Sequence, residues 1–374
     1  MVGSTLYLTW TETGKIYFRT LNTASKVWSS AVRIDPTTPA ATIQQQSRVV
    51  SNGATTPVPY VTYTECDPAC KVWVKKWNAA AWEAVGGSLN VDPTRSAQDS
   101  AIVFDGRNPP VPYVIWTEAD ASGVMQIFVK RFDAASSSWI LVGGGSLTVN
   151  PVVLNVGGQN PSIAIGGFTI KAAWAECTSA DCELYVKRLE ADTWLPASPT
   201  SLKVGHLSVA PKPNDPSLAF INDGLNNTLY LAWHENIAFY VKKENPDGSF
   251  TSVGTIPDSP SSSSGISFGG TASAAQVPYI VFADSTNPAT KIFVNRWNGT
   301  GWVTEGNGAL NMTHGGSQPS TVDSSIAFLQ GTPYVAWSER GACIVPLTSP
   351  PGSPFTVCGQ NNSSSYQIYV KRLE

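Results

Sequence analysis

The chain has 374 residues and a net charge of −3 at neutral pH, and only 14% of its residues are charged. Soluble domains usually carry about 25% charged residues, so this composition, rich in Gly and Pro, indicates a turn-rich all-β protein. Lys and Arg occur in pairs at most, which excludes the basic cluster that nucleic-acid binding needs. No apolar run approaches the roughly 20 residues that span a bilayer.

A short motif, aromatic-x-acid, recurs along the chain at the end of an alternating strand pattern. Its seven copies are Trp10/Glu12, Tyr63/Glu65, Trp116/Glu118, Trp174/Glu176, Trp233/Glu235, Phe282/Asp284 and Trp337/Glu339. Short alternating segments bounded by Gly, Pro, Asn and Ser predict β-strands. Seven copies at similar spacing therefore predict seven related β units.

Three further strand patterns accompany each motif. The strand after it reads aliphatic-aromatic-Val-Lys-Arg, as in 127–131, and the next carries an aromatic residue and a Val-Gly-Gly-x-Leu tail, as in 82–89. A strand of small residues, such as 161–165, precedes most copies. Each unit thus contains four antiparallel strands, although the first unit lacks the innermost strand and the last lacks the outermost.

Units of this size with four strands each are typical of a β-propeller. We therefore predict an all-β fold, with residues 1–374 forming one domain: a single seven-bladed β-propeller of four-stranded antiparallel blades. The repeat units lie at approximately 5–35, 45–91, 97–149, 159–204, 214–255, 264–312 and 322–374.

The six cysteines fall into three local pairs, each inside one predicted loop: Cys66 with Cys70, Cys177 with Cys182, and Cys343 with Cys358. Local pairing predicts three disulfides, which persist mainly in oxidising compartments. The expected location is therefore secreted or cell-surface, and the periplasm is also compatible. The third pair lies in a long excursion between Arg340 and Gln367.

The repeated residues are interpreted as structural. The acids of the aromatic-x-acid motif and the cations of the Lys-Arg strand are predicted to form cross-strand pairs, each worth about 0.2–1 kcal/mol. The repeated tryptophans are predicted to pack between blades. No catalytic residue is assigned to either column.

Departures from repetition are the candidate ligand-binding positions, since propellers present variable loops at one face. Four residues precede the innermost strand and would ring the mouth of a central channel: Asp99, Asn160, Asp215 and Asp323. They can hold a cation such as Ca²⁺ or a polar ligand, or cap turns locally. His206 and His314 follow two outer strands at matching positions, but two histidines without a third ligand do not define a metal site, so no metal site or cofactor is predicted.

One outer strand, Trp82-x-x-Val85-x-Gly87-x-Leu89, together with Ile127-Phe128-Val129-Lys130, resembles the tectonin-type lectin propellers. The repeats also resemble those of secreted bacterial surface propellers. The resemblance implies a glycan-binding propeller. The Trp-x-Glu strand departs from the tectonin Trp-Gly-Val-Asn, so no sugar-contacting residue is carried over.

The sequence contains no Gly-x-Ser-x-Gly elbow in a credible strand-to-helix context and no sialidase-type Ser-x-Asp-x-Gly-x-x-Trp repeat. We therefore predict a non-enzymatic extracellular or cell-surface binding module whose partner is a glycan or a surface protein. Two alternatives stay open: a structural or assembly domain of a larger surface protein, and a sialidase-like glycoside hydrolase.

Overall fold

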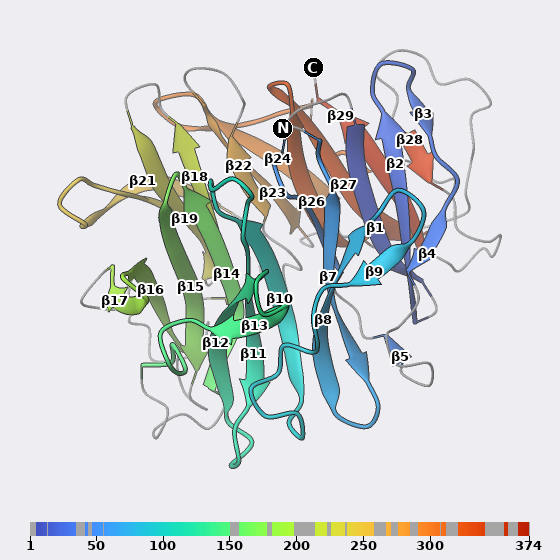
Figure 1. The fold of residues 1–374 in the computed structure, drawn as a ribbon. Helices are drawn as coiled ribbons and strands as arrows, with labels where there is room; N and C mark the ends of the chain where they lie inside the picture. Colours follow the sequence, from blue (N-terminus) through green and yellow to red (C-terminus); the bar gives the residue numbers. More distant parts are fainter. Residues whose placement is uncertain are drawn as a thin grey trace. The chain divides into compact units, whose positions relative to one another are not determined.

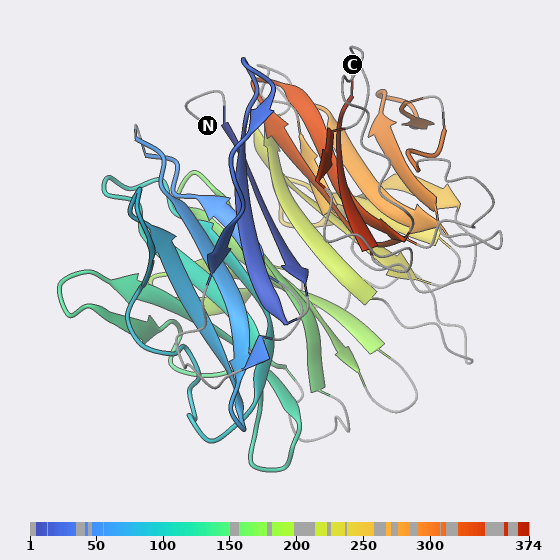
Figure 2. The same ribbon diagram turned by 90° about the vertical axis from the view of Figure 1, so that its right-hand side faces the viewer.

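The computed structural model describes residues 5–12, 14–34, 42–43, 47–54, 56–149, 157–177, 182–197, 214–222, 226–235, 238–257, 267–270, 276–284, 291–306, 308–311, 321–340, 355–357 and 366–373. These residues form strands and turns, and none of them belongs to a helix long and apolar enough to cross a membrane. The chain divides into two compact units, Met1–Lys203 and Val204–Glu374. Figure 1 labels the strands, and Figure 2 gives a side view.

Three sheets are described in the first unit. The first sheet contains β1 (Thr5–Glu12), β2 (Lys15–Asn22), β3 (Val27–Trp28) and β4 (Val32–Ile34). The second contains β5 (Thr42–Ile43), β6 (Arg48–Ser51), β7 (Pro59–Cys66), β8 (Cys70–Trp77) and β9 (Trp82–Ala84). The third contains β10 (Ala97–Phe104), β11 (Pro112–Ala119), β12 (Met125–Asp133), β13 (Ser138–Leu141), β14 (Gly157–Gly166), β15 (Thr169–Cys177), β16 (Cys182–Glu190) and β17 (Thr193–Pro196).

The second unit also shows three sheets in its described part. They are β18 (Asn214–Asn222), β19 (Asn227–Glu235), β20 (Ala238–Glu244) and β21 (Phe250–Pro257); then β22 (Ser267–Gly270), β23 (Pro278–Asp284), β24 (Lys291–Trp297) and β25 (Trp302–Thr304); then β26 (Thr321–Leu329), β27 (Thr332–Arg340), β28 (Phe355–Val357) and β29 (Tyr366–Arg372). The predicted antiparallel, four-stranded organisation is thus confirmed in these sheets.

The eight-stranded sheet of the first unit consists of two four-stranded repeats joined by one parallel bridge, Met125 to Gly157. Gly157 has a φ of +77°, and a Cβ built on it would lie 2.1 Å from the Met125 carbonyl oxygen. Only glycine permits an approach this close. The eight-stranded sheet is therefore two four-stranded blades that touch at a single residue pair.

The last sheet corrects one expectation. The sequence predicts that the final repeat lacks an outermost strand, but β28, which lies inside the 340–367 excursion, pairs antiparallel with β29 at that position. The prediction is wrong because the outer strand precedes its neighbour in the chain here, whereas it follows its neighbour in the other repeats. In the first repeat, β1 pairs with β2, and the described residues show no pairing on its other edge; the expected lack of an innermost strand stays a prediction.

The tryptophans of the Trp-x-Glu motif pack between neighbouring repeats. Trp116 on β11 is completely buried and belongs to one apolar cluster with Val72 and Val74 of β8, which lies in the preceding sheet. Trp174 on β15 belongs to a cluster with Ile127 of β12. The predicted role of these tryptophans in packing blade against blade is therefore confirmed for these pairs.

The Val-Gly-Gly tail of the outer strand receives the next repeat's outer tryptophan. The Trp139 indole N–H donates to the Val85 carbonyl at 2.7 Å, and the Trp194 indole donates to the Val142 carbonyl at 3.2 Å. Gly143 follows Val142 with a φ of +81°, and a Cβ on it would lie 2.4 Å from Trp194 Cδ1. Glycine is required there by backbone conformation and by space.

Three alanine substitutions separate these two requirements. We expect Gly143→Ala to lower the free energy of unfolding by about 2–4 kcal/mol, because strain from the positive φ adds to overpacking. Gly144→Ala has the positive φ but open space and should cost about 1 kcal/mol. Gly145→Ala meets neither obstacle and should be nearly neutral. Urea denaturation measures all three, and equal values for Gly143→Ala and Gly144→Ala would contradict the packing argument.

Candidate functional site

Three of the predicted ligand-binding residues lie in β-bulges of the innermost strands. Asp99, Asn160 and Asp215 have φ angles of +53°, +48° and +50°, and the strand register shifts across each of them. Asp and Asn tolerate this left-handed conformation better than other non-glycine residues. Bulges change the direction of a side chain and are frequent beside active sites. These three repeats place a polar side chain at the bulge of the innermost strand.

Hydrogen bonds fix both flanks of the Asp99 bulge. The Thr62 hydroxyl donates to Ser100 Oγ at 2.9 Å in a buried contact between β7 and β10. The Thr117 hydroxyl donates to the Gln98 carbonyl at 3.1 Å, and Gln98 Nε2 donates to Asp99 Oδ2 at 3.3 Å. The bulge is thus a defined feature that holds the Asp99 backbone in one conformation.

The structure places the bulge residues in each unit as follows. In the first unit Asp99 is on β10 and Asn160 is on β14, and these two inner strands pack against each other (Figure 1). In the second unit Asp215 is on β18, and Asp323 lies within the register shift of β26, between Val322 and Ser324. The Asp323 side chain lies outside the described part.

The acids of the Trp-x-Glu motif are engaged as structural acceptors. Glu118 is 2% exposed, and its carboxylate accepts the Trp116 indole N–H at 2.9 Å and the backbone N–H groups of Val91 and Asp92 at 2.8 and 2.7 Å. Val91 and Asp92 belong to the segment that links the preceding sheet to β10. The carboxylate therefore ties one repeat to the next.

The same arrangement recurs at Glu176 in the following repeat. This carboxylate accepts the Trp174 indole N–H at 2.8 Å and the Val149 backbone N–H at 2.5 Å. A buried carboxylate whose oxygens already accept donors of this kind is poorly placed to meet a substrate. The motif acids are thus part of the frame, as the sequence indicates.

The lysines of the Lys-Arg strand do not sit opposite these acids. Lys130 is the cross-strand neighbour of Val114, whereas Glu118 is opposite Gln126. The two positions are offset along this hairpin, so the pair is not directly opposite, although the charge of Glu118 still acts on Lys130. Lys130 Nζ instead lies 5.8 Å from the centre of the Trp116 ring and donates to the Asn90 carbonyl at 3.2 Å.

Burial lowers the pKa of these lysines. Desolvation lowers the pKa of the Lys130 ammonium, and the negative charge of Glu118 partly offsets this change. Lys187 repeats the pattern: its Nζ lies 5.7 Å from the Trp174 ring centre, donates to the Leu147 carbonyl at 2.7 Å, and has a pKa lowered chiefly by desolvation. Cation–π contact and a carbonyl acceptor together hold each lysine in place.

Two of the three predicted disulfides are confirmed. Cys66–Cys70 closes the β7–β8 hairpin with a Cα–Cα distance of 3.9 Å, and Cys177–Cys182 closes the β15–β16 hairpin at 4.0 Å. Cys343 and Cys358 lie outside the described residues. The confirmed pairs sit at the same end of their hairpins in the second and fourth repeats of the predicted array.

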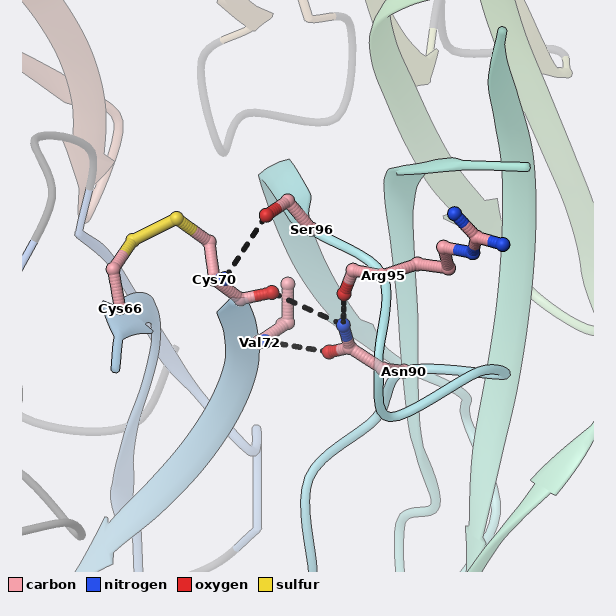
Figure 3. The surroundings of a disulfide bond; sticks show 6 residues. All are labelled: Cys66, Cys70, Val72, Asn90, Arg95 and Ser96. Carbon is pink, nitrogen blue, oxygen red and sulfur yellow. Dashed lines mark hydrogen bonds between the residues drawn. A yellow bond between two sulfur atoms is a disulfide. The ribbon is translucent and has the colours of Figure 1, made fainter. Parts of the chain in front are cut away.

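The first disulfide is connected to the segment that leads into the Asp99 bulge (Figure 3). The Cys70 N–H donates to Ser96 Oγ at 3.1 Å. Asn90 Nδ2 donates to the carbonyls of Cys70 and Arg95 at 3.1 and 2.8 Å, and its Oδ1 accepts the Val72 N–H at 3.0 Å. The stapled hairpin and the segment 90–96 therefore form one rigid support below the bulge.

Asn90 represents a repeat position that the sequence analysis missed. Thr148 and Asn311 occupy the corresponding place, directly after the recurrent Leu of the outer-strand tail. Each accepts a backbone N–H from the start of the Lys-Arg strand: Thr148 from Ile127 at 3.2 Å and Asn311 from Ile292 at 2.6 Å. The signal was a polar residue directly after Leu89, Leu147 and Leu310. Its role is to anchor the linker to its own sheet.

Two further predicted ligand-binding positions, both histidines, are not described by the structure. His206 and His314 both lie outside the described residues. Among the residues that are described, no group of three His, Cys, Asp or Glu side chains is arranged to hold a metal ion. The suggestion of Ca²⁺ in a central channel stays a prediction.

Comparisons with known proteins give a fold but no family. No known protein family and no curated protein matches the sequence. Among solved structures, a protein of unknown function from Dyadobacter fermentans matches 88% of this chain and 93% of its own length, with a TM-score of 0.54 and 10% identity. The Penicillium chrysogenum α-L-arabinanase complexed with arabinobiose matches 87% of this chain and 92% of its own, with a TM-score of 0.52 and 11% identity.

A third structure, Trypanosoma rangeli sialidase, matches 99% of this chain and 60% of its own length, with a TM-score of 0.53 and 10% identity. These matches support a β-propeller fold for this chain. At such identities the likeness concerns the fold, and the predicted likeness to tectonin lectins stays a prediction.

The comparisons contradict the prediction that this protein is not an enzyme, because the structures that share the fold are mainly glycoside hydrolases. The prediction relied on the absence of a compact catalytic motif. In a propeller, polar side chains that meet at one site come from strands of different repeats; Asp99 and Asn160, for example, lie on inner strands of different repeats. Such residues are far apart in the sequence, so the absence of a short catalytic motif does not indicate the absence of an activity.

The structural role of the motif acids is open to a direct test. We expect Glu118→Gln to lower the free energy of unfolding by about 2–4 kcal/mol, because an amide NH₂ then faces buried N–H donors and a charged acceptor is lost. Urea denaturation measures the change. Glu83→Gln, on the exposed β8–β9 hairpin, is the control and should change stability by less than about 0.5 kcal/mol. Equal effects of the two substitutions would contradict the proposed linkage between repeats.

Proposed function

We propose that this chain is an extracytoplasmic, carbohydrate-active β-propeller with seven blades that hydrolyses glycosidic bonds. The observation that carries the proposal is the fold match to an arabinanase over 87% of this chain and 92% of that enzyme. The match to a sialidase supports the same class of chemistry. The substrate class is a glycan, and the particular sugar is left to experiment.

Glycoside hydrolysis usually needs two carboxylic groups that flank the bond, one to protonate the leaving oxygen and one to act as base or nucleophile. Glu118 and Glu176 are buried acceptors of backbone and indole N–H groups and do not suit that task. Asp215 and Asp323 both lie at bulge positions on inner strands of the second unit, and we assign this task to them.

The bulge positions suit a reacting or binding group for a physical reason. The residues on both sides of Asp99 are held by hydrogen bonds, from Thr62 to the Ser100 hydroxyl and from Thr117 to the Gln98 carbonyl, so this part of the strand needs little ordering when a ligand binds. Asn160 offers an amide with both donor and acceptor atoms, which is suited to sugar hydroxyls. The two confirmed disulfides support an oxidising compartment, where extracellular glycans are found.

The proposal predicts measurable hydrolysis. The purified chain, incubated with a panel of arabinan, sialosides and other plant and bacterial polysaccharides, should release reducing sugar from at least one of them. On that substrate we expect Asp215→Asn and Asp323→Asn each to lower kcat by about 10²–10⁴-fold, the usual contribution of a general acid or base, and Asp99→Asn to raise KM.

Asp247→Asn is a matched control, because Asp247 lies in the exposed turn between β20 and β21, where it accepts the Ser249 N–H at 2.9 Å. It should leave kcat unchanged. Thermal unfolding of every variant separates lost chemistry from lost folding. Binding of a glycan without hydrolysis, or full activity in all three bulge variants, would overturn the proposal.

A further inference from the structure

The sixth repeat departs from its counterparts at three positions that lie on one face of the sheet. In the third, fourth and fifth repeats these positions carry a tryptophan, a glutamate and a lysine: Trp116, Glu118 and Lys130, then Trp174, Glu176 and Lys187, then Trp233, Glu235 and Lys242. The sixth repeat has Phe282, Asp284 and Asn295 instead. Each of these side chains is smaller than its counterpart, and the positive charge of the lysine is lost.

The strand register places Asn295 where the other repeats have the lysine. Lys130 is opposite Val114, and Asn295 is opposite Ile280. In both repeats the opposite residue comes two positions before the aromatic residue of the motif, and the fourth and fifth repeats have the same register. Such diagonal neighbours share one face of a sheet. The Asn295 side chain therefore lies on the same face as the Phe282 ring.

In the other repeats the lysine ammonium lies over the tryptophan ring of the motif. The distance from Nζ to the ring centre is 5.8 Å for Lys130, 5.7 Å for Lys187 and 5.6 Å for Lys242. Burial lowers the pKa of each lysine, and the charge of the motif glutamate partly offsets this change. A cation beside a ring face and near a carboxylate is thus a regular feature of the repeat.

Asn295 brings a buried acceptor to this position. The residue is only 6% exposed, and in the part of the chain that the structure describes its Oδ1 accepts no hydrogen bond. Phe282 is 4% exposed and belongs to an apolar cluster, where its ring centre lies 4.7 Å from that of Phe239. An unpaired oxygen in apolar surroundings costs free energy. A positive charge beside this oxygen would therefore be stabilising.

Lys291 does not replace the missing lysine of the repeat. It is directly opposite Asp284, at the start of β24. The second repeat has the same feature, because Lys71 is opposite Glu65, and it nevertheless keeps Lys75, which is 7% exposed, at the lysine position of the repeat. A lysine opposite the motif acid and a cation beside the motif ring are thus separate features.

We propose that the sixth repeat binds a monovalent cation of the size of potassium or ammonium, held between Asn295 Oδ1 and the face of the Phe282 ring. The ion takes the place that a lysine ammonium has in the other repeats, and Asp284 supplies negative charge on the same face. Calcium and magnesium require about six or more oxygen ligands, whereas an amide oxygen and a π face suit a weakly hydrated monovalent ion. The site is independent of the hydrolysis proposed above.

Thermal unfolding in two salts tests the proposal. Potassium acetate and tetramethylammonium acetate are compared at equal ionic strength, so that charge screening is the same in both. Tetramethylammonium is too large for a buried site. Because an ion that binds the folded chain stabilises it, saturating potassium should raise the Tm of the wild-type chain by at least about 3 °C. Ammonium acetate should act in the same way.

Three variants locate the ion at Asn295. Asn295→Lys supplies the positive charge from the chain itself, and Asn295→Leu removes the oxygen at similar side-chain size, so both should show the same Tm in the two salts. The leucine variant keeps the test decisive if the lysine variant does not fold. Asn298→Asp is the control: it lies in the exposed turn between β24 and β25, keeps an oxygen that can accept the Thr300 N–H, and should retain the full potassium effect.

Thallium(I) substitutes for potassium and is visible by its anomalous scattering. Crystals of the wild-type chain grown in thallium acetate should show an anomalous peak in contact with Asn295 Oδ1 and the Phe282 ring, and crystals of Asn295→Lys should not. Three results would overturn the proposal: equal wild-type Tm values in the two salts, a potassium effect that persists in both Asn295 variants, or an ordered water at Asn295 Oδ1 without an anomalous peak.

Discussion

The buried carboxylate of the Trp-x-Glu motif is the interaction on which the repeat depends. Glu118 collects the indole N–H of its own strand and two backbone N–H groups of the segment that arrives from the preceding sheet. A linker of this kind has no strand partners for its amides, and unpaired buried amides are costly. One charged side chain per repeat satisfies them and thereby fixes where the next inner strand begins.

That fixed beginning determines the candidate site. The linker held by Glu118 and Asn90 leads within a few residues into the Asp99 bulge, and the stapled β7–β8 hairpin supports it from the side. The polar bulge residue is thus carried by this frame, and the carboxylates and lysines of the frame hold the repeats together. This division explains why the repeated acids and lysines, which are the most conspicuous charges in the sequence, are poor candidates for chemistry.

Much of the frame could be predicted from the sequence, because each frame residue repeats and its role is local. The alternation of the strands, the packing of Trp116 between sheets and the two hairpin disulfides all follow from short patterns. The offset between Lys130 and Glu118 could not be predicted, because it depends on hairpin register, and a shift of two residues changes the partner without changing the pattern. The outer strand within the 340–367 excursion was missed because it precedes its partner in the chain.

Which residues form the candidate site could not be predicted from the sequence, for a related reason. A strand pattern reports which face of a sheet is buried, but it does not report which residues of different repeats come together at one end of the sheets. Asp99 and Asn160 are 61 positions apart in the printed sequence, and only the packing of β10 against β14 relates them. Repetition identifies the scaffold because selection for packing acts on every copy alike. Function therefore has to be sought where the copies keep the bulge geometry but differ in the side chain it carries, as Asn160 differs from Asp99 and Asp215.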